Sequence, residues 1–183
     1  MKTVQHKAVE DLHSLANPEM MPDYMRFFKT GKEDYGEGDK FLGIKMPDIR
    51  KVIKQINNWD LVDVTAPHVV GAHLLNRDRT VLYEFTHSDD LWKKRIAIIS
   101  TFAFINAHQY DDTLNIADIL LHDTHDLIHK AVGWAIRNVG IKELHVELDF
   151  LQTRYQKMPR TMLRYAIEKF DESLRLDYLK GRI

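Results

Sequence analysis

The feature that most constrains the fold is a helical spacing of apolar residues, which recurs from Trp59 to the C-terminal part of the chain. The spacing predicts helices over 61–75, 80–85, 91–105, 113–121, 127–139, 144–155 and 162–170, with short breakers such as Gly140 and Pro159 between them. No run alternates with a period of two, and no Asn-Gly or Asp-Gly hairpin signal is present. The sequence therefore predicts an all-α fold.

A weak internal repeat indicates how these helices are arranged. Residues 90–97 align with 126–133 at an offset of 36, and a looser third copy surrounds 162–166, about 34 residues further on. Helix pairs at such intervals are typical of HEAT or armadillo-like α-solenoids, which present a long interaction surface. We expect residues 1–183 to form a single HEAT-like repeat domain, a superhelix of antiparallel helix pairs.

Composition narrows the classes of function. The 26 basic and 27 acidic residues leave a net charge of −1, so an anionic partner must be held by a local patch. There is no cysteine, which excludes disulfides, thiolate metal sites and a cysteine nucleophile, and which fits a cytoplasmic protein. No secretory signal is visible, and the apolar stretch 96–105 is far too short to span a bilayer, so we expect no membrane association.

No motif for a cofactor or metal emerges. The glycine-rich segment 30–39, which follows predicted helices over 4–15 and 22–28, lacks phosphate-binding spacing, so it is expected to be an exposed connection before a helix over 48–55. A dense cluster of histidine and aspartate, without an HExxH motif, comprises His122, Asp123, His125, Asp126 and His129. A junction between a loop and a helix commonly collects these residues as caps, so we expect neither a metal nor a cofactor.

Trp59 and Asp63 are the first candidate functional pair. If Asn58 caps a helix, the two side chains project from one face at positions i and i+4. An aromatic plane beside a carboxylate can hold a cation or orient a water molecule. Taken alone, the pair is better explained as a half-buried tryptophan beside a solvated aspartate.

Basic residues recur at the repeat interval and form the second candidate feature. Lys94 and Arg95 begin one predicted helix, while Lys130, Trp134 and Arg137 share a face of another. Further cations, including Arg160 and Arg164, follow in the C-terminal part. Stacked repeats would align these cations as a stripe suited to a phosphate backbone. Ordinary solvated helix faces, with Trp134 in the core, explain the same pattern about equally well.

Eight blocks in order along nearly the whole chain resemble the DNA alkylation repair glycosylases of the AlkD type. The N-terminal blocks are Asn17-Pro18-Glu19, Phe28-Lys29-Thr30-Gly31-Lys32, Tyr35-Gly36-Glu37-Gly38-Asp39-Lys40-Phe41-Leu42-Gly43-Ile44 and Pro47-Asp48-Ile49-Arg50. The later blocks are Trp59-Asp60-Leu61-Val62-Asp63, Trp92-Lys93-Lys94-Arg95-Ile96-Ala97-Ile98, 126–137 and 158–169.

The resemblance implies a HEAT-like enzyme that excises positively charged N3- and N7-alkylated purines from duplex DNA. It implies a catalytic cluster of Trp59, Asp63, Trp134 and Arg95, with Arg137 on a phosphate. A cationic base leaves without a general acid, so one carboxylate that stabilises an oxocarbenium ion and positions water is sufficient. Arg95 is expected to hold the DNA backbone near the lesion. Double-stranded DNA with alkylated purines is then the expected partner.

Two departures from the family pattern stand in the N-terminal third. Only residues 51–56 separate the Arg50 helix from the Trp59 block, where the family has at least one further helix pair. Phe27 occupies a lesion-side position where the family often has tyrosine. We expect a monomer, although a missing repeat would leave faces that could pair by swapping. The alternative to a glycosylase is a catalytically inactive HEAT-like scaffold that binds DNA or protein.

Overall fold

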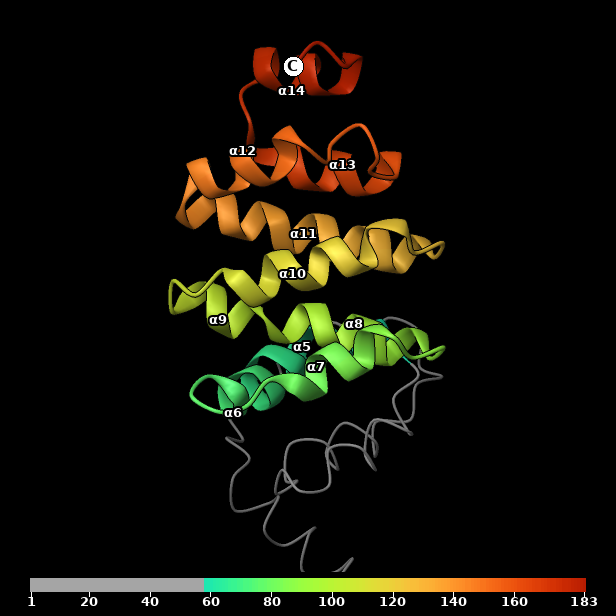
Figure 1. Cartoon of the computed structure of the whole chain (residues 1–183), viewed down its shortest axis with the longest axis vertical. Coiled ribbons are helices and arrows are strands. Elements are labelled where there is room, and N and C mark those ends of the chain that lie inside the picture. Colours follow the sequence, from blue (N-terminus) through green and yellow to red (C-terminus); the bar gives the residue numbers. More distant parts are fainter. Residues whose placement is uncertain (1–57) are drawn as a thin grey trace, which may run out of the picture.

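The computed structural model describes residues 58–183, and within this range all regular elements are helices (Figure 1). They are α5 (Trp59–Thr65), the π-helix η3 (Ala66–Gly71), α6 (Ala72–Leu74), α7 (Thr80–Thr86), α8 (Leu91–Ser100), α9 (Phe102–Asn106), α10 (Asp111–Ile119), the 3-10 helix η4 (Leu120–His122), α11 (Asp126–Lys142), α12 (Leu144–Gln152), α13 (Arg160–Ala166), the 3-10 helix η5 (Ile167–Lys169) and α14 (Glu172–Lys180). The predicted all-α class is confirmed.

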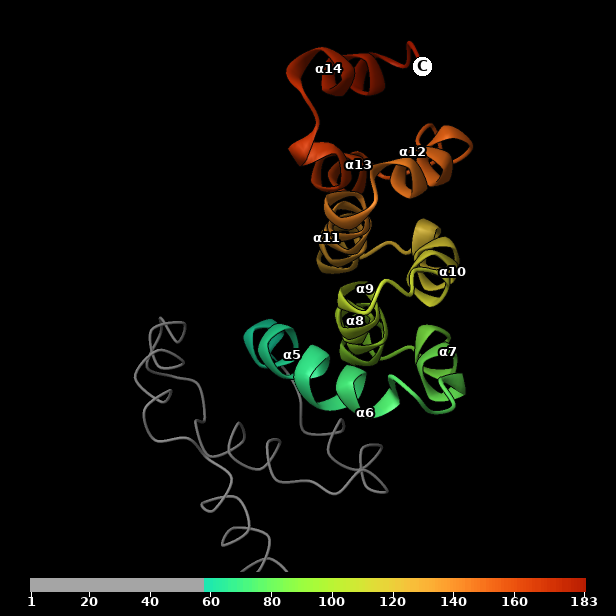
Figure 2. The same cartoon turned by 90° about the vertical axis from the view of Figure 1, so that its left-hand side faces the viewer.

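The helices stack in two rows, which are seen most clearly in Figure 2. We call α8, α11 and α13 the inner row, and α7, α10 and α12 the outer row. Consecutive inner helices pack on one another, and α5 packs on α8 at the side away from the outer row (Figure 2). The inner helices begin at Leu91, Asp126 and Arg160, close to the expected intervals. This packing is a helical repeat, as the sequence predicts.

Side-chain caps explain where several helices begin. The side chain of Asn58 accepts a hydrogen bond from the Asp60 N–H at 3.0 Å and starts α5, as predicted. Asp90 caps α8 in the same way through the N–H of Trp92, at 2.9 Å. These caps fix the residues of the first turn, including Trp59, relative to the helix axis.

Three predicted elements differ in detail from the observed ones. The expected helix over 61–75 contains a π-helical segment, in which the Ala72 N–H bonds to the Pro67 carbonyl five residues back. Pro67 has no N–H to donate, so the normal ladder is interrupted there. The expected helix over 91–105 is divided at Thr101, whose hydroxyl bonds to the Ile98 carbonyl at 2.6 Å. Gly140 does not separate two helices but lies inside α11.

The core is a continuous apolar layer between the two rows. Its largest fully buried side chains include Phe104, Leu82, Ile116, Ile136 and Met162. Ion pairs add contacts between successive repeats, joining residues 29 to 36 apart. These pairs are Asp63–Arg95, Arg79–Asp112, Lys94–Asp123, Asp118–Arg154 and Arg137–Glu168.

Several predictions lie outside the described residues. They are the N-terminal helices, the glycine-rich connection, the shortened segment 51–56 and the lesion-side position of Phe27. Within the described range, no helix is both long and apolar enough to cross a membrane.

Candidate active site and nucleic-acid interface

Asp63 and Arg95 form a bidentate ion pair between α5 and α8. Arg95 Nε donates to Asp63 Oδ1 at 2.8 Å, and Arg95 Nη2 donates to Asp63 Oδ2 at 2.6 Å. The third nitrogen, Nη1, donates to the Leu127 carbonyl at the start of α11. Arg95 is only 4% exposed, so its whole guanidinium group is engaged inside the protein. The arginine therefore joins three successive helices of the stack at the carboxylate.

The environment of Asp63 acts on its ionisation in two opposing ways. Burial raises the pKa of the Asp63 carboxyl above its ordinary value, while the hydrogen bonds and charge of Arg95 lower it. Without Arg95 the carboxyl would lose the interactions that favour its ionised form. The pair thus keeps a partly desolvated carboxylate at the surface of α5, with a side chain that is 12% exposed.

Trp59 and Trp134 occupy different environments. Trp59 lies one turn before Asp63 and is 50% exposed, so its ring is open to a ligand. Trp134 lies on α11, the helix next to the one that carries Arg95, and is partly buried against the core. Its ring meets Phe102 edge-on, with 4.8 Å between centroids. The structure therefore brings Trp59, Asp63 and Arg95 to one place and holds Trp134 on the adjoining helix.

Four of the predicted DNA-binding cations already have partners inside the protein. Lys94 pairs with Asp123 and Lys130 with Asp126, each at 2.7 Å, and Arg137 pairs with Glu168. Arg160 Nη1 donates to the Leu179 carbonyl at 2.8 Å. Arg164 is exposed on α13 and makes no ion pair or hydrogen bond with a described residue.

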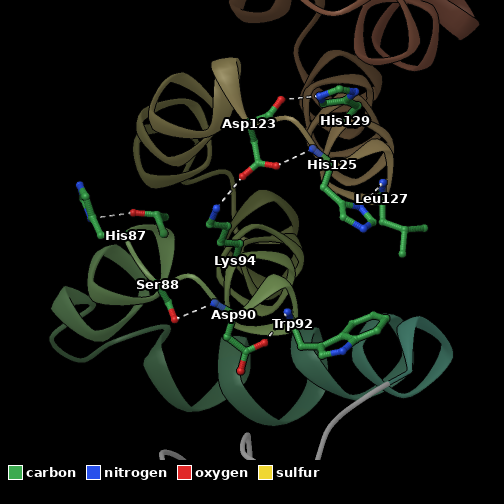
Figure 3. A network of polar contacts seen from close by, with 10 residues as sticks. His87, Ser88, Asp90, Trp92, Lys94, Asp123, His125, Leu127 and His129 are labelled. Atoms are coloured by element: carbon green, nitrogen blue, oxygen red, sulfur yellow. Dashed lines mark hydrogen bonds and ion pairs between the residues drawn. The ribbon is translucent and has the colours of Figure 1, made fainter.

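The histidine and aspartate cluster contains caps and ion pairs, and Figure 3 shows those of Asp123, His125 and His129. Asp123 accepts from Lys94 and from the His125 N–H at 2.8 Å, and the His129 ring contacts the Asp123 carbonyl. His125 itself caps α11 through the N–H of Leu127. Among the described residues no group of three or more such side chains is placed to hold a metal ion.

The sequence did not reveal the acidic partners of the cations. Asp123 and Glu168 lie 29 and 31 residues after Lys94 and Arg137. A search for opposite charges separated by about one repeat would have found them, because stacked repeats bring such residues together.

Comparison with known families now identifies the class. The sequence profile of the family described as DNA alkylation repair enzyme matches residues 8–56 and 49–170, which covers most of the chain. The chain belongs to this family, as the resemblance predicted. The comparison with curated proteins gives no match.

Proposed function

We propose that the protein is a DNA glycosylase that excises positively charged N3- and N7-alkylated purines from duplex DNA, in base excision repair of alkylation damage. The observation that carries the proposal is the buried Asp63–Arg95 pair beside the exposed ring of Trp59. Membership of an alkylation repair family supports the DNA substrate. A HEAT-like stack of helices offers a long face for the duplex.

The proposed chemistry requires little from the enzyme beyond a well-placed carboxylate. An alkylated purine cation is already a good leaving group, so its glycosidic bond breaks without protonation. Asp63 stabilises the oxocarbenium ion that develops on the sugar and positions the attacking water. The exposed face of Trp59 favours the cationic nucleotide, a contribution of about 0.5–2 kcal/mol.

Arg95 receives a different role from the phosphate contact that the resemblance suggested. Because its guanidinium group is engaged by Asp63 and Leu127, we assign it as a positioning residue that holds the carboxylate ionised and oriented. Trp134, on the adjoining helix, would line the same face. Arg137, Lys94, Lys130, Arg160 and Arg164 remain the proposed phosphate contacts.

The direct test is release of 7-methylguanine from methylated duplex DNA. Asp63→Asn should lower the rate of release by roughly 10²–10³-fold while leaving the DNA dissociation constant nearly unchanged, since the amide keeps the shape but not the charge. Asp89→Asn, a matched change at an exposed loop residue, should release base at the wild-type rate.

Two outcomes would contradict the proposal. If Asp63→Asn is folded and as active as the wild type, Asp63 does not act on the sugar or the water. If the folded wild type binds DNA in a strongly salt-dependent manner but releases no base, the protein is a DNA-binding scaffold.

A further inference from the structure

Tyr165 is an aromatic residue on the inner row that neither the repeat pattern nor the family match assigns to a role. Among the tryptophan, tyrosine and phenylalanine side chains of the described residues, only two are exposed, Trp59 at 50% and Tyr165 at 36%. Trp59 lies on α5 and Tyr165 on α13, and the helices α5, α8, α11 and α13 pack on one another in that order (Figure 2).

The packing of α13 on α11 fixes the direction of Tyr165. Asp126 interacts with Thr161, Gly133 approaches Tyr165, and Arg137 pairs with Glu168 further along. Residues later in α11 contact residues later in the α13 segment, so the two helices run parallel. Tyr165, one turn after Thr161, therefore lies on the face that α13 shares with Asp126 and Lys130.

The base of the Tyr165 side chain is held tightly although its ring is exposed. A Cβ atom added to Gly133 would lie 2.5 Å from Tyr165 Cβ and 2.4 Å from the Met162 carbonyl oxygen. The absence of a side chain at Gly133 thus lets the two helices meet at Tyr165. A ring anchored at its base presents its surface to a ligand at a low cost in conformational entropy.

Lys130 lies on α11, the helix that packs between the helix of Arg95 and the helix of Tyr165. Lys130 lies three residues before Gly133, the residue at which α11 meets Tyr165, and its charge acts on both Tyr165 and Arg95. That hydroxyl makes no hydrogen bond to any described residue, and Lys130 keeps 39% of its side chain exposed. A phenol donor and an ammonium group on neighbouring helices are a combination that suits a phosphate oxygen.

We propose that Tyr165 is a further DNA-binding residue, whose hydroxyl donates to a backbone phosphate next to the nucleotide held at Asp63. This inference rests on the proposed function. Lys130 attracts the same phosphate by its charge, and the Tyr165 hydroxyl orients the phosphate by a directional hydrogen bond. Trp59 and Tyr165 then contact the duplex from α5 and from α13, with α8 and α11 between these helices.

Fluorescence anisotropy with a labelled undamaged duplex at constant salt tests the proposal. Tyr165→Phe should weaken binding by about tenfold, because a hydrogen bond to a charged group is lost while the ring remains. Tyr165→Ala should weaken it at least as much. Tyr110→Phe, a matched loss of a hydroxyl at the start of the outer-row helix α10, should bind as the wild type does.

The readouts separate this inference from the proposed function. Thermal unfolding of Tyr165→Phe should match that of the wild type, so that a binding defect cannot be a folding defect. Wild-type affinity of Tyr165→Phe, in a protein that binds duplex DNA and releases alkylated base, overturns the role of Tyr165 alone. A wild-type protein that does not bind duplex DNA overturns both.

Discussion

At the scale of single residues, Glu147 is an acid buried against α11. It is 2% exposed, and its Oε1 atom has no hydrogen-bond partner among the described residues. A Cβ atom on Gly140 would lie 1.6 Å from Glu147 Oε2, so the carboxyl group occupies the space that the glycine leaves. Burial raises its pKa to about 8, against the attraction of Arg137. Burial thus favours the protonated form of this carboxyl group at neutral pH.

This carboxyl group makes stability depend on pH with a definite sign. The folded chain keeps the proton up to about pH 8, whereas the unfolded chain releases it near the ordinary value of 4.5. Between these limits the folded state binds more protons, so the free energy of unfolding from Glu147 falls as pH rises and levels off above pH 8. Glu147→Gln should remove this decline and raise the melting temperature most at pH 8 to 9.

Thermal unfolding from pH 5 to 9 checks this prediction. Asp149→Asn, on the exposed side of the same helix, should keep the wild-type pH profile. A Glu147→Gln profile that runs parallel to the wild type would mean that the glutamate is ionised in the folded protein.

At the scale of secondary-structure elements, the close contact of α11 with α13 depends on Gly133. An exposed Gly→Ala change inside a helix normally stabilises it, by about 1 kcal/mol. Here the new methyl group would meet the Met162 carbonyl oxygen at 2.4 Å, and backbone atoms cannot move aside cheaply. Gly133→Ala should therefore destabilise the protein by roughly 1–3 kcal/mol, as overpacking does.

Chemical denaturation measures whether Gly133→Ala raises or lowers the free energy of unfolding. Lys142→Ala, at an exposed residue of the same helix, serves as a control and should change stability by less than about 1 kcal/mol, because surface substitutions usually do. An increase in the stability of Gly133→Ala would show that α13 is free to move away from α11.

The sequence predicted the helices well where the spacing of apolar residues defined them. It predicted them poorly where the role of a residue depends on a contact with another helix. The helical spacing located α7, α11 and α12, and Asn58 was recognised as a cap. Gly140 was interpreted as a breaker because its contact with Glu147 of the next helix leaves no local signal. The helix α14 was not predicted, since its mean hydropathy is low and its few apolar residues give only a weak helical pattern.

At the scale of the whole molecule, the candidate site was predictable in part. The resemblance located Trp59, Asp63 and Arg95, and the structure places them together. The resemblance could not show that Arg95 pairs with Asp63. An ion pair between two repeats depends on how the repeats stack, and neither the Trp59 block nor the Trp92 block carries that information. For the same reason the resemblance could not show the carboxylates that form ion pairs with Lys94, Lys130 and Arg137.

The carboxylates that pair with these cations should weaken DNA binding, and the net charge of −1 gives no general attraction for DNA to offset them. A phosphate that approaches Arg137 must compete with Glu168, which is 49% exposed beside it. Glu168→Gln removes both the competition and a charge that repels the phosphate. We expect it to bind duplex DNA several-fold more tightly, with a steeper salt dependence by about one released counterion.

A change of net charge alone would also tighten binding, so the control must match it. Glu172→Gln makes the same change of charge on α14, where Glu172 pairs with Arg175. It should gain less affinity than Glu168→Gln. The gain should also vanish when Arg137 is absent, so Arg137→Ala and Arg137→Ala/Glu168→Gln should bind with nearly equal constants. Equal gains from Glu168→Gln with and without Arg137 would place the phosphate elsewhere on this face.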